Sequence, residues 1–321
     1  MSECKGDVAA LTAPSSETLQ APELLDDMLA ELAGAMKILT VECGDTQDTL
    51  REAMNYSLGL RGKRARGLLV MLVMAGWKRP WRHALCCAKA IEMVHTASLI
   101  IDDLPSMDNA STRRGKATNH VKFGESVSIL AAVSLLSEAL RVLATSPDLN
   151  ADQRHMAVTC LASAIGPNGM SGGQTRDLAS SGGEMADVEL THALKTGTLF
   201  AAATELGCIA ADIRGPHKWL LSDYGMLLGK AFQEFDDLID VATGQEQAGK
   251  DTLKDVTKPT IVSMLGLERA EQRAIQQVET ALECLEASGI QANMLRQFTL
   301  DLTRAMRTMI HGSPQMGKVS A

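Results

Sequence analysis

The chain has 321 residues with 45% hydrophobic side chains, 3% aromatic ones and nine prolines, a usage that predicts packed helices and an all-α fold. Its formal net charge of -8 and its lack of long lysine or arginine runs argue against nucleic-acid binding, which needs a basic face. Seven scattered cysteines without metal-ligand spacing argue against a disulfide framework or a zinc site, and favour a reducing cytoplasm.

The N-terminal residues 1–20 contain acids and hydroxyls but neither a basic start nor an apolar signal core, so we expect them to be disordered. No apolar run approaches the roughly 18 residues of a membrane span, so we do not expect an integral membrane protein. From residue 21 onward, segments rich in Gly, Pro, Asn or Ser separate about ten helical patterns without an obvious linker. We therefore predict a single all-helical domain over residues 21–321.

Four cations stand directly before an expected helix, at Arg61, Lys63, Arg64 and Arg66. A helix N-terminus is itself an anion site, because its first N–H groups lack partners within the helix and the helix dipole is positive there. The segment is therefore a candidate phosphate site. For this segment alone, a solvated basic turn explains the same residues equally well.

The first acidic cluster, DDLPSMD, follows the apolar helical pattern AIEMVHTASLI. Pro105 disfavours helical geometry at Leu104, so the helix should end there, and a loop would let Asp108 turn back toward Asp102. His95 precedes Asp102 by two helical turns on the same face, so it should point into the same cavity. A lone histidine on an apolar helix is more often a core residue, but its neighbours here favour the cavity.

Further candidate cations follow along the chain. Planar guanidinium groups bind phosphate oxygens in pairs, although each of these residues alone would more often be ordinary surface. They are Arg113, Arg114, Lys195 with the adjoining Thr196, Lys250 and Lys258.

The second acidic cluster lies in FQEFDDLID, an apolar and unbroken segment that should be helical. Asp236 and Asp240 are four residues apart and share a helix face, with Gln233 one turn before Asp236. Mg²⁺ takes oxygen ligands and is commonly shared between one or two carboxylates and substrate phosphates. Either cluster alone could be solvated surface, but two such clusters in apolar helices indicate a metal and phosphate site.

Taken together, GKRAR (62–66), DDLPSMD (102–108), RRG (113–115), KTG (195–197) and FQEFDDLID (232–240) resemble the short-chain trans-prenyl diphosphate synthases, the isoprenoid chain-elongating enzymes. The resemblance runs from about Arg61 to Gly266 and includes MSGGQTRDL, whereas the first sixty and last fifty residues add only helix-like sequence. It implies a helical bundle around a deep central cavity, with the acidic motifs facing each other at its mouth. It also implies a homodimer.

The resemblance further implies roles for individual residues. The implied ligands of Mg²⁺, with three ions when substrate is bound, are Asp102, Asp103, Asp108, Asp236, Asp237 and Asp240. The implied contacts of the allylic diphosphate are Arg113, Lys195, Thr196, Gln233 and Lys250, and those of isopentenyl diphosphate are Lys63, Arg66, His95 and Arg114. Lys195, Thr196 and Gln233 would act in catalysis, the last two by stabilising an allylic carbocation through their dipoles.

Product length is implied by the residues before the first acidic motif. In family members that stop at fifteen carbons, an aromatic residue four or five positions before the motif forms the floor of the product tunnel. Ser98 and Ala97 stand at these positions, so the resemblance implies a twenty-carbon product, geranylgeranyl diphosphate, for isoprenoid and carotenoid biosynthesis. Met93, one turn deeper, is a candidate for the next floor, although a core position explains it equally well.

Three other functions are weighed against this one. A farnesyl diphosphate synthase of the same family would differ only in product length. A cyclising terpene synthase would need no second diphosphate pocket, and GKRAR with two complete acidic motifs disfavours it. A non-catalytic partner subunit of another synthase would be expected to have degraded metal motifs, and both are intact here.

Overall fold

The structure is a computed structural model that describes residues 21–38, 48–60, 62–179, 183–247 and 259–312. The expected disordered segment 1–20 lies outside these residues. The elements in chain order are α1 (Ala21–Ile38), α2 (Asp48–Leu58), α3 (Ala65–Gly76), η1 (Trp81–Ala84), α4 (Leu85–Asp102), β1 (Thr112–Arg113), β2 (Lys116–Ala117), α5 (Asn119–Phe123), α6 (Glu125–Ala144), α7 (Ala151–Ile165), α8 (Met170–Ala179), α9 (Met185–His192), η2 (Ala193–Gly197), α10 (Thr198–Ala210), α11 (Pro216–Gln247), α12 (Ile261–Leu265), α13 (Leu267–Ala287) and α14 (Asn293–His311). The all-α prediction is confirmed.

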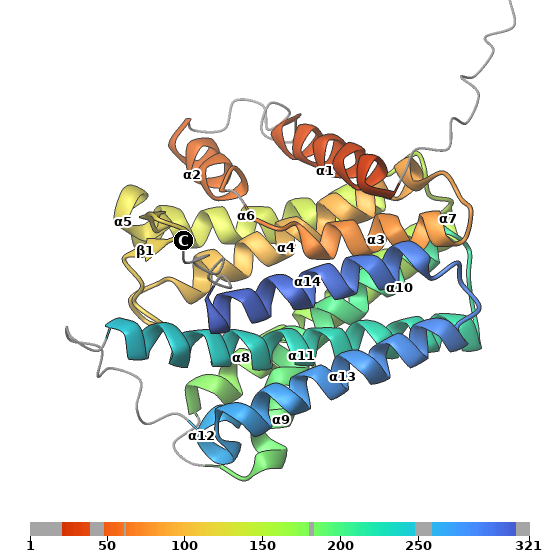
Figure 1. Cartoon of the computed structure of the whole chain (residues 1–321). Coiled ribbons are helices and arrows are strands. Elements are labelled where there is room, and N and C mark those ends of the chain that lie inside the picture. The colour runs from red at the N-terminus through yellow and green to blue at the C-terminus, as the bar shows by residue number, and fades with distance from the viewer. Residues whose placement is uncertain (1–20, 39–47, 61, 180–182, 248–258, 313–321) are drawn as a thin grey trace, which may run out of the picture.

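The long helices lie side by side around one hydrophobic core (Figure 1). Helix α11 packs against α10, α13 and α14, while α3 packs against α4 and α10, and α4 against α6. The sequence of α3, ARGLLVMLVMAG, is apolar on all sides, and all its residues but Ala75 are buried, as expected of a helix inside a bundle. Helices α13 and α14 each bury one apolar stripe and leave the other face in solvent.

The end of α4 follows the sequence prediction. The helix stops at Asp102, and the chain then folds back, because the Asp108 N–H donates to the Asp102 carbonyl at 2.9 Å and the Asn109 N–H donates to the Leu104 carbonyl at 3.0 Å. Pro105 lies inside this turn. The main chain therefore brings Asp108 back beside Asp102, as a straight helix could not.

Two helical segments are long and apolar enough to span a membrane, by length and composition alone. From the sequence we expected no apolar segment of that length. The two segments are Trp81–Asp102 with a mean hydropathy of 1.5 and Glu125–Ala144 with 1.8. The first is 67% buried inside the bundle, and core helices of soluble proteins are commonly this long and apolar. The second, α6, is 39% buried and exposes Ile129, Leu130 and Val133.

Candidate active site

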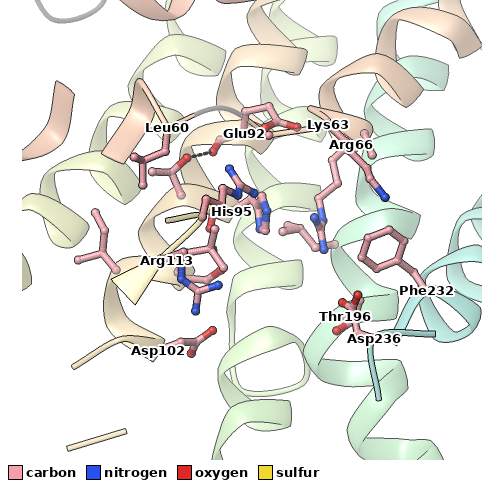
Figure 2. Close-up of a pocket in the computed structure, with 18 of the residues that line it drawn as sticks. Leu60, Lys63, Arg66, Glu92, His95, Asp102, Arg113, Thr196, Phe232 and Asp236 are labelled. Carbon is pink, nitrogen blue, oxygen red and sulfur yellow. Dashed lines mark hydrogen bonds between the residues drawn. The ribbon is translucent and has the colours of Figure 1, made fainter. Parts of the chain in front are cut away.

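A cavity of about 690 Å³ opens among α3, α4, α8, η2, α10, α11 and α14. It contains most of the polar residues that the sequence analysis selected (Figure 2). Those that line it are Lys63, Arg64, Arg66, His95, Ser98, Asp102, Asp103, Arg113, Arg114, Lys195, Thr196, Gln233 and Asp236. Arg61, Lys250 and Lys258 lie outside the described residues.

Two carboxylates face each other across this cavity, Asp102 at the end of α4 and Asp236 on α11 (Figure 2). Burial raises the pKa of Asp102 to about 6, with Lys195 opposing the shift and Asp108 adding to it. Burial also raises the pKa of Asp236 to about 7, and the neighbouring Asp240 adds to that shift. Burial therefore disfavours the ionised form of both carboxylates, and a bound cation would favour it.

The donor set fits a metal that is shared with a ligand. Among the described residues, no three Asp, Glu, His or Cys side chains gather closely enough to hold an ion alone. Asp102 and Asp236 line opposite walls, and Asp108 and Asp240 are exposed at the ends of the two motifs. Oxygen donors in small number suit Mg²⁺ whose remaining positions are filled by water and phosphate oxygens.

Two of the six implied metal ligands, Asp103 and Asp237, contact other side chains instead of presenting free carboxylate oxygens to the cavity. Asp103 is 3% exposed and is bound by Arg113, whose Nε donates to both carboxylate oxygens at 2.9 and 3.0 Å. Asp237 does not line the cavity, and its side chain contacts Gln233 and His192 instead. A carboxylate engaged by a guanidinium group has few lone pairs left for an ion.

The RRG motif forms the tip of the hairpin between β1 and β2. Arg114 and Gly115 both have positive φ, at 52° and 74°, as the two central residues of a type I′ turn do. The turn directs the arginines to different partners. Arg113 binds Asp103, while the Arg114 guanidinium lies against Gly62 beside the basic segment before α3.

That basic segment forms a cationic cluster of Lys63, Arg64, Arg66 and Arg114. Burial lowers the pKa of Lys63 and lowers the pKa of Arg66 to about 10. The Arg66 guanidinium stacks on the Phe200 ring at 4.4 Å, and its Nε has no hydrogen-bond partner among the described residues. Four cations gathered at one wall of a cavity, with Arg66 buried among them, are typical of a site for a highly charged anion.

One buried acid, Glu92, opposes this charge and was not selected from the sequence. It is 1% exposed, accepts the Gly67 N–H at 2.9 Å and pairs with Arg64 Nη1 at 3.3 Å. Nearby, burial and then Arg66 and Arg114 hold the pKa of His95 well below its usual value. His95 is therefore a neutral hydrogen-bonding group at neutral pH rather than another cation.

Lys195 and Thr196 lie in η2, a five-residue π-helical turn that the sequence analysis did not foresee. Such turns occur frequently at functional sites, because the wider turn redirects side chains. Lys195 Nζ pairs with Asp177 on α8 at 2.8 Å. Burial alone would lower the pKa of Lys195, but Asp177 and then Asp102 outweigh it and raise the pKa.

Gly173 on α8 lets this helix touch η2. A Cβ at Gly173 would lie 2.6 Å from the Lys195 Cα. Because this atom belongs to the backbone, the clash cannot be relieved by a change of side-chain rotamer. We expect Gly173→Ala to lower the free energy of unfolding by about 1–3 kcal/mol and to lower kcat by displacing Lys195. Thermal unfolding and steady-state kinetics would measure both effects.

Gly34→Ala is the matched control for this substitution. Gly34 lies in helix α1, and a Cβ there would meet nothing within 4 Å. Gly34→Ala should therefore leave the free energy of unfolding unchanged or raise it by up to about 1 kcal/mol. Equal effects of the two substitutions would contradict the close-packing explanation.

The cavity also has walls that the sequence analysis missed. Met306 and Met309 come from α14, a region that carries no motif, and Lys63 Nζ lies 3.3 Å from the Met306 Sδ. Gln174, inside MSGGQTRDL, lines the cavity with both amide atoms buried and unpartnered among the described residues. The motif itself pointed to Gln174, whereas nothing in the sequence pointed to the methionines.

The three product-length candidates divide between two faces of α4. Ser98 lines the cavity. Ala97 and Met93 are both 0% exposed in the hydrophobic core and do not line it. Any tunnel past Ala97 would therefore continue beyond the open cavity, between packed helices.

Comparison with known proteins places this site in a family. The sequence model of the polyprenyl synthetase family matches residues 47–295. The geranylgeranyl diphosphate synthase of Pseudescherichia vulneris is 38% identical over 79% of this chain and 83% of its own length. The farnesyl diphosphate synthase of Bacillus subtilis (strain 168) is 34% identical over 78% of this chain and 87% of its own.

A solved structure shows the same fold with 26% sequence identity. It is a geranyltransferase from Helicobacter pylori complexed with magnesium and isoprenyl diphosphate, and it aligns with a TM-score of 0.77 over 91% of this chain and 99% of that one. The match of the family model covers the cationic cluster, η2 and both acidic motifs. The chain is a prenyltransferase and belongs to the polyprenyl synthetase family.

Proposed function

We propose that the protein joins isopentenyl diphosphate to an allylic diphosphate with five, ten or fifteen carbons and releases diphosphate. The observation that carries this proposal is that one cavity contains two kinds of anion site. The opposed carboxylates Asp102 and Asp236 would hold one diphosphate through a metal ion, and the cationic cluster around Arg66 would bind a second diphosphate directly. A cyclising synthase would need only the first of these sites.

The residues of the cavity have distinct roles in this reaction. Asp102 and Asp236, with Asp108 and Asp240, would hold Mg²⁺, three ions when substrate is bound, which neutralises charge on the leaving diphosphate. Lys195 and Arg113, with Lys250, bind oxygens of the allylic diphosphate. Lys63, Arg66, Arg114 and the neutral His95 hold isopentenyl diphosphate.

The bond changes follow from this placement. The allylic C–O bond breaks to leave a carbocation, and the double bond of isopentenyl diphosphate attacks it to form the new C–C bond. A proton is then lost to the departed diphosphate, which restores an alkene. Leu199, Phe232 and Met306 line the cavity and exclude water that would otherwise capture the carbocation.

An assay with labelled isopentenyl diphosphate and each of the three allylic starters tests the proposal. The purified chain alone should incorporate label only with a divalent cation. Cyclic products formed without isopentenyl diphosphate would indicate a terpene synthase. No turnover until another synthase is added would indicate a partner subunit.

We propose a twenty-carbon main product, with a fifteen-carbon product as the alternative, because Ala97 is small and fully buried. Ala97→Tyr is expected to shift the main product to fifteen carbons, since the ring would fill the space that the longer chain needs. Chromatography of the products measures this shift. An unchanged product length in a folded Ala97→Tyr variant would contradict the role of Ala97, and Ala97→Ser is the control that adds little volume.

We also propose that the protein is a cytoplasmic homodimer, joined through the exposed apolar face of α6. Ile129, Leu130 and Val133 are 47%, 56% and 53% exposed there, an arrangement typical of an interface. Leu130→Glu is expected to convert the dimer to a monomer in sedimentation experiments. Leu267→Glu on α13, where the side chain is 39% exposed, is the control that should leave the dimer intact.

A further inference from the structure

A chain of hydrogen bonds connects the second acidic motif to the cavity. Thr196 Oγ1 lies 2.6 Å from Gln233 Oε1, and Gln233 Nε2 lies 3.2 Å from Asp237 Oδ1. We propose that Asp237 is a positioning residue, which acts through Gln233 to make Thr196 present an oxygen lone pair to the cavity. This inference rests on the proposed carbocation chemistry.

The direction of these two hydrogen bonds follows from which groups can donate and which can only accept. An ionised carboxylate only accepts hydrogen bonds, so the NH₂ end of the Gln233 amide must face Asp237. The amide oxygen then faces Thr196 and accepts a hydrogen bond from its hydroxyl group. Thr196 has a single proton to donate, and once it is directed at Gln233, only lone pairs remain for the cavity that Thr196 lines.

Asp237 is held away from the cavity by its surroundings. Successive residues of an α-helix are rotated by about 100°, so Asp237 projects to a different side from Asp236, which does line the cavity. The His192 Nε2 lies 3.3 Å from the Asp237 Oδ2 in a contact that is not aligned as a hydrogen bond. Both side chains are nearly buried, at 9% and 11% exposed.

The polarity of Thr196 matters for a cationic intermediate. A lone pair directed at positive charge stabilises it, whereas a hydroxyl proton directed the same way is repelled. The neighbouring Lys195 is held by Asp177 and can contribute only positive charge. Of these two side chains, that of Thr196 is therefore the one that favours the carbocation, provided that its hydroxyl proton stays directed at Gln233 Oε1.

The resemblance to prenyl diphosphate synthases implies another role for Asp237, as a metal ligand, and conservative substitution separates the two. Asn in place of Asp237 keeps one oxygen that can accept from Gln233, but it lacks the charge of a metal ligand. Leu keeps the approximate volume and removes the acceptor. The positioning role predicts that Asp237→Asn stays within about threefold of the wild-type kcat and that Asp237→Leu loses about ten- to hundredfold.

The experiment measures kcat, the Mg²⁺ concentration at half-maximal rate, and the calorimetric affinity for inorganic diphosphate in the presence of Mg²⁺. Both Asp237 variants should keep the wild-type Mg²⁺ midpoint and diphosphate affinity, whereas Asp236→Asn should lose them. Gln233→Leu should match Asp237→Leu, and the double variant should lose no more, because the two act in one chain.

Two outcomes would overturn the inference. One is a tenfold higher Mg²⁺ midpoint in Asp237→Asn, which remains informative even if Asp237→Leu does not fold. The other is an additive loss in the double variant. A wild-type protein that incorporates no isopentenyl diphosphate would instead contradict the proposed function itself, so the two failures are distinguishable.

Discussion

Asp102→Asn is expected to lower turnover by about a thousandfold or more, since it removes a carboxylate that would hold the metal charge against the leaving diphosphate. Asp102 lines the cavity at the end of α4, and asparagine retains its shape without its charge. Single-turnover assays with saturating Mg²⁺ and both substrates would measure the loss. Asp223→Asn, on the exposed surface of α11, should have no effect.

The same substitution is expected to stabilise the metal-free protein at neutral pH. Burial raises the pKa of Asp102 to about 6, so ionisation of this carboxyl opposes folding. That cost is absent at pH values below the ordinary pKa of an aspartate and is complete above about pH 6. Asp102→Asn should therefore raise the free energy of unfolding by roughly 1–3 kcal/mol at pH 8 and have little effect at pH 4.

The absence of a pH-dependent difference between wild type and Asp102→Asn would contradict the burial explanation. Retained turnover would contradict the catalytic assignment. Because the two measurements are independent, a variant with high stability and no activity is the expected combination. It would show that this carboxylate is held in the cavity at the expense of stability.

Arg66→Met is expected to raise the KM for isopentenyl diphosphate by about a hundredfold, with a smaller effect on the allylic substrate. Arg66 is 9% exposed and its Nε is unpartnered among the described residues, so a phosphate oxygen in the cavity would give this group a partner. Burial lowers the pKa of this guanidinium to about 10. Steady-state kinetics with each substrate varied in turn would measure the effect.

Arg66→Met should weaken the binding of isopentenyl diphosphate but stabilise the folded protein. For a base with a lowered pKa, the charged form opposes folding at every pH below the folded pKa, here about 10. Arg66→Met should therefore raise the free energy of unfolding by on the order of 1–3 kcal/mol. Arg269→Met on the exposed side of α13 is the control. A destabilised Arg66→Met variant with a normal KM would contradict both the predicted rise in KM and the predicted gain in stability.

The local parts of the site could be predicted from the sequence. Pro105 set the end of α4, and the four-residue spacing of Asp236 and Asp240 required a helix, which α11 provides. The basic residues before Ala65 precede a helix as expected. These features depend on neighbouring residues, so period and turn chemistry are sufficient to find them.

The parts that depend on tertiary contacts could not be predicted. The contact of Lys63 with Met306 joins residues 243 positions apart, and no local pattern marks it. The π-helical turn at η2 is approached closely by Gly173 of α8 and by Gly229 of α11, and these contacts join segments that are distant in the sequence. Counting back along α4 also does not tell which side chains line the open cavity. Ser98, four residues before Asp102, lines it, whereas Ala97, five residues before, is buried in the core.

The hairpin that carries Arg113 and Arg114 has a consequence for how the two substrates bind. Its strands are two residues long, so the backbone positions of the adjacent arginines are coupled through the turn. If one arginine contacts each substrate, occupancy of one pocket changes the position of the cation that serves the other. We expect the two substrate affinities to be thermodynamically linked, each ligand altering the dissociation constant of the other by the same factor.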